Sequence, residues 1–146
     1  MVYNIIKKKT EERFMIKLIY GPKGFGKTKI IMDDINAAAK DAKGNIVFIT
    51  DKPVCSVSIN LNVRCVYTDE YGISSVEALK GFIMGLVAGN SDIEGIYVDG
   101  ILRIADCKLT DLEELFIAIK KVEGVKFELT VSAEKSELPK FMLEYV

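Results

Sequence analysis

The chain has 146 residues, of which 49% are hydrophobic and 28% charged, and its formal net charge is −1. This length suits about one domain with a full core, and the charge argues against a protein that binds nucleic acid regardless of sequence. Three cysteines without a C-x-x-C pair, and no histidine, favour neither a disulfide framework nor a zinc site. No segment suits a membrane span or a signal peptide, so we expect a cytoplasmic protein.

Residues 1–14 are expected to form an N-terminal extension, accessory or disordered, because Lys7, Lys8 and Lys9 belong to a solvated charge run. Met15 directly precedes an apolar strand. The single domain is therefore predicted to cover residues 15–146.

A glycine-rich turn joins the apolar strand at 16–20 to a helix predicted over 27–40. Its sequence matches the phosphate-binding pattern G-x-x-x-x-G-K-[ST] (Walker A), in which backbone N–H groups and a helix N-terminus face a phosphate. We expect the Lys27 ammonium to reach the β- and γ-phosphates and the Thr28 hydroxyl to ligate Mg²⁺. The residues expected to bind the nucleotide are Gly21, Pro22, Lys23, Gly24, Phe25, Gly26, Lys27, Thr28 and Lys29.

Short apolar strands are predicted at 46–50 and 63–68, and the strand–helix–strand order indicates a parallel sheet. Ser74 and Glu77 have capping-box spacing and predict a helix over 74–88. This helix is apolar on most sides, so it is either buried or part of an interface. Burial within the monomer is favoured over a homo-oligomer or protein-partner contact. Glycines at every fourth position are expected to allow close packing.

A second nucleotide pattern follows, in which the apolar strand 94–98 ends at Asp99 (Walker B). An aspartate at the carboxyl end of a strand, opposite Thr28, can hold Mg²⁺ directly or through water. We therefore predict Thr28 and Asp99 as the metal-binding residues.

The remainder predicts a helix opened by the capping pair Thr110 and Glu113, a strand at 125–131 with alternating apolar and polar residues, and a last strand at 141–146. The expected fold is a three-layer α/β/α domain with a mostly parallel sheet.

With both patterns present, residues 15–146 resemble the P-loop NTPase superfamily, and within it the RecA/ASCE division. That division has an extra strand between the loop strand and the aspartate strand. The chain is also similar to small stand-alone bacterial ATP-binding proteins, some labelled as twitching-motility ATPases, at residues 20–28, 67–72 and 130–133. The resemblance implies that Ser132 contacts the γ-phosphate. The absence of N-K-x-D favours ATP over GTP.

Members of the ASCE division usually carry a glutamate directly after the strand aspartate, where this chain has Gly100. Asp69 or Glu70, which follow the strand at 63–68, are the candidates to activate water, and the alternative is that both are turn residues. Arg103 either neutralises transition-state charge or forms a surface salt bridge, and the salt bridge is favoured.

These patterns predict a protein that binds ATP and Mg²⁺ and hydrolyses ATP slowly, with Lys27 as a catalytic residue. The alternative is a non-hydrolysing switch or adaptor that signals through the helix at 74–88. A nucleoside kinase-like phosphotransferase is less favoured, because no acceptor pocket or lid segment is visible in the sequence.

Overall fold

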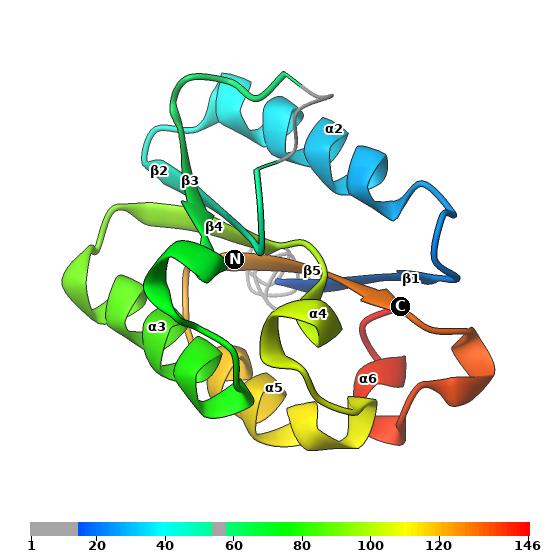
Figure 1. Ribbon diagram of the computed structural model, residues 1–146. Coiled ribbons are helices and arrows are strands. Elements are labelled where there is room, and N and C mark those ends of the chain that lie inside the picture. The colour runs from blue at the N-terminus through cyan, green and yellow to red at the C-terminus, as the bar shows by residue number, and fades with distance from the viewer. Residues whose placement is uncertain (1–14, 54–57) are drawn as a thin grey trace, which may run out of the picture.

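A computed structural model describes residues 15–53 and 58–146, which form a five-stranded parallel sheet with helices on both faces (Figure 1). The strand order across the sheet is β1-β5-β4-β2-β3, and all pairings between neighbouring strands are parallel. The strands are β1 (Ile16–Gly21), β2 (Asn45–Thr50), β3 (Val63–Tyr67), β4 (Ile93–Val98) and β5 (Lys126–Ser132). The predicted three-layer α/β/α fold is therefore confirmed.

Helix α2 covers one face of the sheet alone, and the remaining helices gather on the opposite face (Figure 1). The helices are α2 (Lys27–Asp41), α3 (Val76–Gly89), α4 (Ile101–Ala105), α5 (Glu113–Lys120) and α6 (Lys140–Leu143), and the 3-10 turns are η1 (Thr68–Tyr71), η2 (Leu109–Leu112) and η3 (Lys135–Glu137). Each face has its own apolar core. Ile31 and Ile35 of α2 pack with Phe48 on one side, whereas Leu79 of α3 packs in the cluster of Phe127 on the other.

The strand order decides which loops can meet. All five strands are parallel, so their carboxyl ends lie at one edge of the sheet. Only β5 separates β1 from β4, which places their ends about 10 Å apart at the usual strand spacing. The loop after β1 and the residue after β4 are thereby brought to the same edge.

Strand β5 is internal although its sequence alternates like a half-exposed strand. Its apolar residues face the α3–α6 side, and the opposite row carries Glu128 and Thr130, which are 0% and 1% exposed. Glu128 lies between Lys17 of β1 and Tyr97 of β4 in the strand register. Thr130 is hydrogen-bonded to Asp99 and to the Gly100 N–H, whereas Glu128 has two lysine ammonium groups nearby.

The prediction for residues 74–88 is partly wrong, because helix α3 runs from Val76 to Gly89. Ser75, and not Ser74, caps its N-terminus, with the Ser75 hydroxyl accepting from the Ala78 N–H at 3.1 Å. Gly81, Gly85 and Gly89 are exposed, and a Cβ added at any of them would meet nothing within 4 Å. The glycines therefore do not serve close packing onto the sheet. The buried contacts come instead from Val76, Leu79 and Ile83.

Two further predictions near the C-terminus are wrong. Residues 141–146 do not form a strand, because α6 occupies 140–143; the Tyr145 carbonyl accepts a hydrogen bond from the Leu18 N–H of β1 at 3.0 Å. Thr110 does not cap a helix either, since it lies inside η2, which runs directly into α5.

No helix in the described part of the chain is long and apolar enough to cross a membrane. The predicted extension at residues 1–14 lies outside the described residues, as does Cys55.

Candidate functional site

The loop between β1 and α2 is held open by its glycines. Gly24 and Gly26 both have φ of 86°, a left-handed conformation that costs other residues energy. Gly26 stands at the N-cap of α2 and provides no side-chain cap. The first N–H groups of α2 are therefore left without a side-chain acceptor, and they carry the positive end of the helix dipole.

The Lys27 side chain folds back over this loop. It is 8% exposed, and its Nζ donates hydrogen bonds to the carbonyls of Gly21 at 2.9 Å and Pro22 at 2.8 Å. Burial lowers the pKa of Lys27, the charge of Asp99 opposes this effect, and the charge of Arg103 adds to it. The ammonium is thus held against the loop carbonyls, within electrostatic range of a carboxylate and of a second cation.

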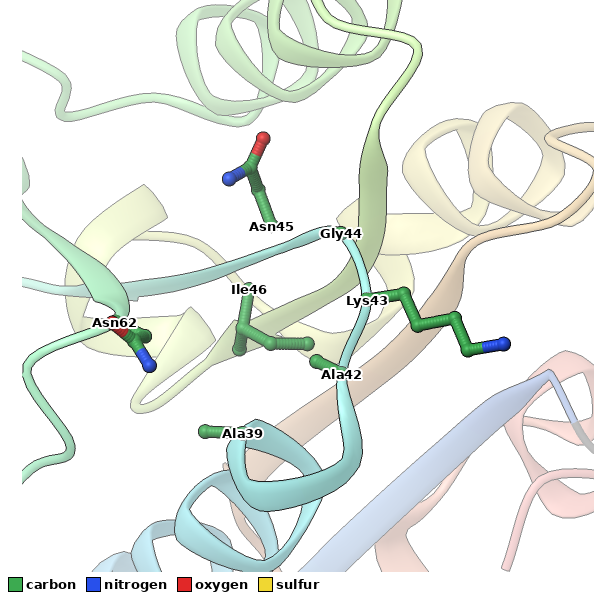
Figure 2. A pocket seen from close by; sticks show the side chains of 7 residues that line it. All are labelled: Ala39, Ala42, Lys43, Gly44, Asn45, Ile46 and Asn62. Atoms are coloured by element: carbon green, nitrogen blue, oxygen red, sulfur yellow. The ribbon is translucent and has the colours of Figure 1, made fainter.

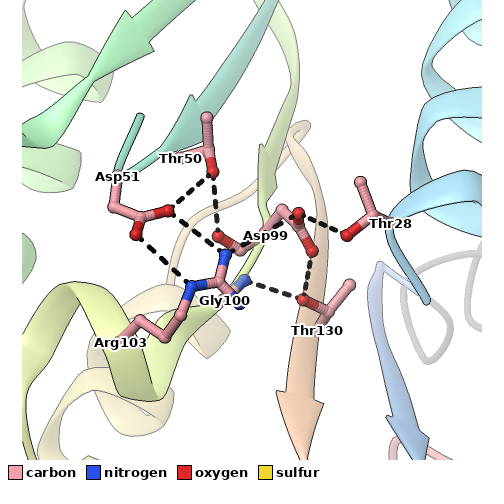
Figure 3. A network of polar contacts seen from close by, with 7 residues as sticks. All are labelled: Thr28, Thr50, Asp51, Asp99, Gly100, Arg103 and Thr130. Carbon is pink, nitrogen blue, oxygen red and sulfur yellow. Dashed lines mark hydrogen bonds and ion pairs between the residues drawn. The ribbon is translucent and has the colours of Figure 1, made fainter. Parts of the chain in front are cut away.

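Asp99 directly follows β4 and is 2% exposed. Both of its carboxylate oxygens accept hydrogen bonds, as Figure 3 shows: Thr28 Oγ1 donates to Oδ2 at 2.9 Å and Thr130 Oγ1 donates to Oδ1 at 2.6 Å. The Thr130 hydroxyl also accepts the Gly100 N–H at 2.8 Å. The structure therefore brings together the two residues that the sequence predicted as metal-binding, Thr28 and Asp99.

An ion pair lies beside this carboxylate (Figure 3). Arg103 of α4 donates from Nη2 to Asp51 Oδ1 at 3.2 Å and from Nε to Asp51 Oδ2 at 3.4 Å. Its Nη2 is also 4.0 Å from Asp99 Oδ2. Burial raises the pKa of Asp51, but the hydrogen bond and charge of Arg103 outweigh it, so the pKa lies below its ordinary value. Asp51 therefore stays ionised at neutral pH.

The residue that directly follows Asp99 is Gly100, so no acidic side chain stands at that position. Its φ is 82°, and a Cβ at this position would overlap the guanidinium of Arg103. The space that a glutamate would need is thus filled by a positive charge. The position directly after Asp99 therefore carries no second carboxylate.

The strand order separates Asp69 and Glu70 from this cluster. Both are exposed in η1, after the edge strand β3, and β2 lies between β3 and β4. At the usual strand spacing β3 is about 10 Å from β4 and about 19 Å from β1. The Asp69 N–H donates to the Asp51 carbonyl at 3.3 Å, which is the nearest link between η1 and the cluster.

The other predicted nucleotide residues lie around the loop. Ser132 ends β5, is exposed and pairs with Gly21 in the strand register. Pro22 and Lys23 are exposed on the loop, and the 65%-exposed Phe25 has its ring against Gly21. The Lys29 side chain is already paired within the helix: its Nζ is 2.8 Å from Asp33 Oδ2, one turn along α2.

Sequence reasoning missed the functional positions of Thr130 and Asp51. Asp51 carries a signal that could have found it, since it closes an apolar strand just as Asp99 does. Thr130 is one of the polar residues of an alternating strand, between Leu129 and Val131. Thr50 joins the group too, with Oγ1 at 3.2 Å from Asp51 Oδ1 and 3.4 Å from the Asp99 main-chain oxygen.

A pocket of about 270 Å³ lies away from this cluster, where β2 begins (Figure 2). It is lined by Ala39, Ala42, Lys43, Gly44, Asn45, Ile46 and Asn62. Lys43 is its one ionisable residue, and no acid–base pair or nucleophile faces it. The pocket therefore offers no acid–base chemistry of its own.

Comparison with protein-family models and with curated proteins finds no match for this sequence. The function is therefore inferred from the geometry of the site.

Proposed function

We propose that the chain binds ATP with Mg²⁺ in the loop at residues 21–28 and hydrolyses it slowly. The observation that carries the proposal is the hydrogen bond of 2.9 Å from Thr28 to Asp99, which joins the loop to a buried carboxylate 71 positions away. Beside this bond, the open N-terminus of α2 and the Lys27 ammonium supply the donors that a polyphosphate requires.

The donor set fits Mg²⁺ as a partner of phosphate. Mg²⁺ is commonly held by one or two carboxylates together with substrate phosphates, and it keeps several waters. Thr28 and Asp99 supply one hydroxyl and one carboxylate, whereas the described residues contain no cluster of three or more metal-binding side chains. When bound, the ion neutralises charge on the β- and γ-phosphate oxygens. Thr130 keeps the Asp99 carboxylate oriented toward Thr28.

Slow turnover follows from the residues that are available to orient water. Gly100 contributes no side chain, and Arg103 covers it. Arg103 forms ion pairs with both Asp51 and Asp99 and thereby links them. The strand order favours Asp51 over Asp69 and Glu70 as the carboxylate that orients water. Because β4 and β5 lie between β1 and β2, the strand that Asp51 follows, Asp51 stands away from the loop and we expect it to be a weak activator.

One observation favours the second candidate, a switch or adaptor that binds ATP without hydrolysis. The sequence from Gly81 to Ser91 contains no charged residue, and its three glycines are exposed on α3. Glycine costs a helix about 1 kcal/mol relative to alanine, and these glycines have no packing role in the monomer. A partner surface gives this segment a use.

Titration calorimetry with Mg·ATP, followed by a phosphate-release assay, tests the proposal. Lys27→Ala should abolish both binding and turnover. Lys40→Ala is the matched control, because it removes an equally charged side chain about 20 Å away at the other end of the same helix. Wild-type binding no tighter than that of Lys27→Ala would refute the nucleotide site. Binding without turnover, with a nucleotide-dependent sedimentation change, would favour the switch.

A further inference from the structure

The Arg103 guanidinium is placed to reach a ligand at the loop. It lies directly over the Gly100 backbone, and its Nη2 is 4.0 Å from Asp99 Oδ2. That is the same oxygen to which Thr28 donates. The guanidinium therefore stands at the side of Asp99 that faces the loop, whereas the other oxygen is taken by Thr130.

The present partner of Arg103 can be exchanged. Its side chain is 51% exposed, and its two hydrogen bonds to Asp51 are 3.2 and 3.4 Å long. Exposed ion pairs stabilise a protein weakly, because water and salt screen them. A phosphate, which accepts paired hydrogen bonds from a planar guanidinium, is a stronger acceptor.

The charges around the loop favour an anion in reach of Arg103. Burial is the main cause that lowers the pKa of Lys27; the charge of Asp99 raises this pKa and the charge of Arg103 lowers it further. Two cations therefore lie within electrostatic range of one buried carboxylate. An added anion between them would relieve their mutual repulsion.

We propose that Arg103 distinguishes nucleoside triphosphates from diphosphates, by leaving Asp51 and binding the terminal phosphate. This inference rests on the proposed function. Loop amides hold the inner phosphates, and the terminal phosphate of a triphosphate lies toward the metal-binding groups Thr28 and Asp99. A diphosphate lacks the group that Arg103 would bind. Asp51 competes for the guanidinium, so it weakens triphosphate binding and leaves diphosphate binding unchanged.

The test measures dissociation constants of Mg·ATP and Mg·ADP by calorimetry on the full chain. Arg103→Met should weaken ATP binding by about tenfold to a hundredfold, the range of one charge-assisted pair, with ADP binding unchanged. Arg103→Lys should retain part of the preference. Asp51→Asn should act in the opposite direction and tighten ATP binding alone. Lys120→Met is the matched control. It likewise removes a cation, from a position before β5, and breaks an exposed ion pair with Glu144 of 3.1 Å.

Three results would overturn the inference. Equal losses of ATP and ADP affinity in Arg103→Met would mean that Arg103 only supports the fold of the site. Weaker ATP binding in Asp51→Asn would mean that Asp51 positions Arg103 and does not compete. A wild-type chain that binds ATP and ADP equally well would also exclude the role while keeping the nucleotide site. Absence of binding to either nucleotide would refute the proposed function itself.

Discussion

Replacing Glu128 with glutamine should remove a large pH dependence of stability. The carboxyl is fully buried, and neither oxygen accepts a hydrogen bond from a described donor. Lys17 Nζ and Lys126 Nζ are 3.6 and 3.9 Å from Oε1, beyond hydrogen-bonding distance. The carboxyl of Asp34, from α2, is close enough to share a proton with it. Tyr97 of β4 completes the surroundings.

These contacts set the sign and size of the effect. Burial, then the neighbouring carboxyl of Asp34, raise the pKa of Glu128 from 4.5 to about 7, and the two lysines oppose this rise. The folded protein therefore keeps the proton where the unfolded chain releases it. The contribution of Glu128 to stability is therefore fully present below pH 4.5 and is lost as the pH rises through 7. At about 1.4 kcal/mol per pKa unit, the loss amounts to about 3 kcal/mol.

Urea unfolding of wild type and Glu128→Gln at several values between pH 5 and pH 8 measures this loss. The neutral amide cannot ionise, so between pH 5 and pH 8 the variant should gain stability relative to wild type by about 2.5 kcal/mol, the part of the loss that falls in this range. Glu114→Gln, at an 82%-exposed carboxylate 3.8 Å from Lys80, is the control and should show no such change. A wild-type-to-variant difference that stays constant with pH would refute the reasoning, because Glu128 would then not titrate in this range.

Three further variants test the packing. Thr130→Val should lower the free energy of unfolding by about 1–3 kcal/mol, because it leaves the Gly100 N–H without its acceptor, and Thr130→Ser should restore most of it in the same urea experiment. Gly100→Ala should cost about 1–2 kcal/mol, since its φ is 82° and its Cβ overlaps Arg103, and a thermal melt unchanged from wild type would contradict this. Gly85→Ala should stabilise α3 by about 1 kcal/mol, because nothing lies within 4 Å of the added Cβ, and a loss of stability would indicate a hidden contact.

Local patterns predicted most elements of the fold, because each pattern is determined by neighbours in the sequence. The glycine-rich turn requires a left-handed backbone at Gly24 and Gly26, and both residues adopt it. The helix after the turn and the apolar strands follow from hydrophobic periodicity. The errors occurred where local signals are ambiguous: the short helix α6 (Lys140–Leu143) lies where a strand at 141–146 was predicted, and Ser75 replaces its neighbour Ser74 as the cap of α3.

The sequence by itself determined the loop, its lysine and the aspartate that ends β4, since each is defined by a short run of residues. Only the tertiary structure decided which distant groups surround them. Strand order places β5 between β1 and β4, so Thr130 reaches Asp99. The same order leaves Asp69 at the far edge and brings Asp51 to Arg103. Lateral neighbours in a parallel sheet are set by long crossover connections, and no local pattern encodes them.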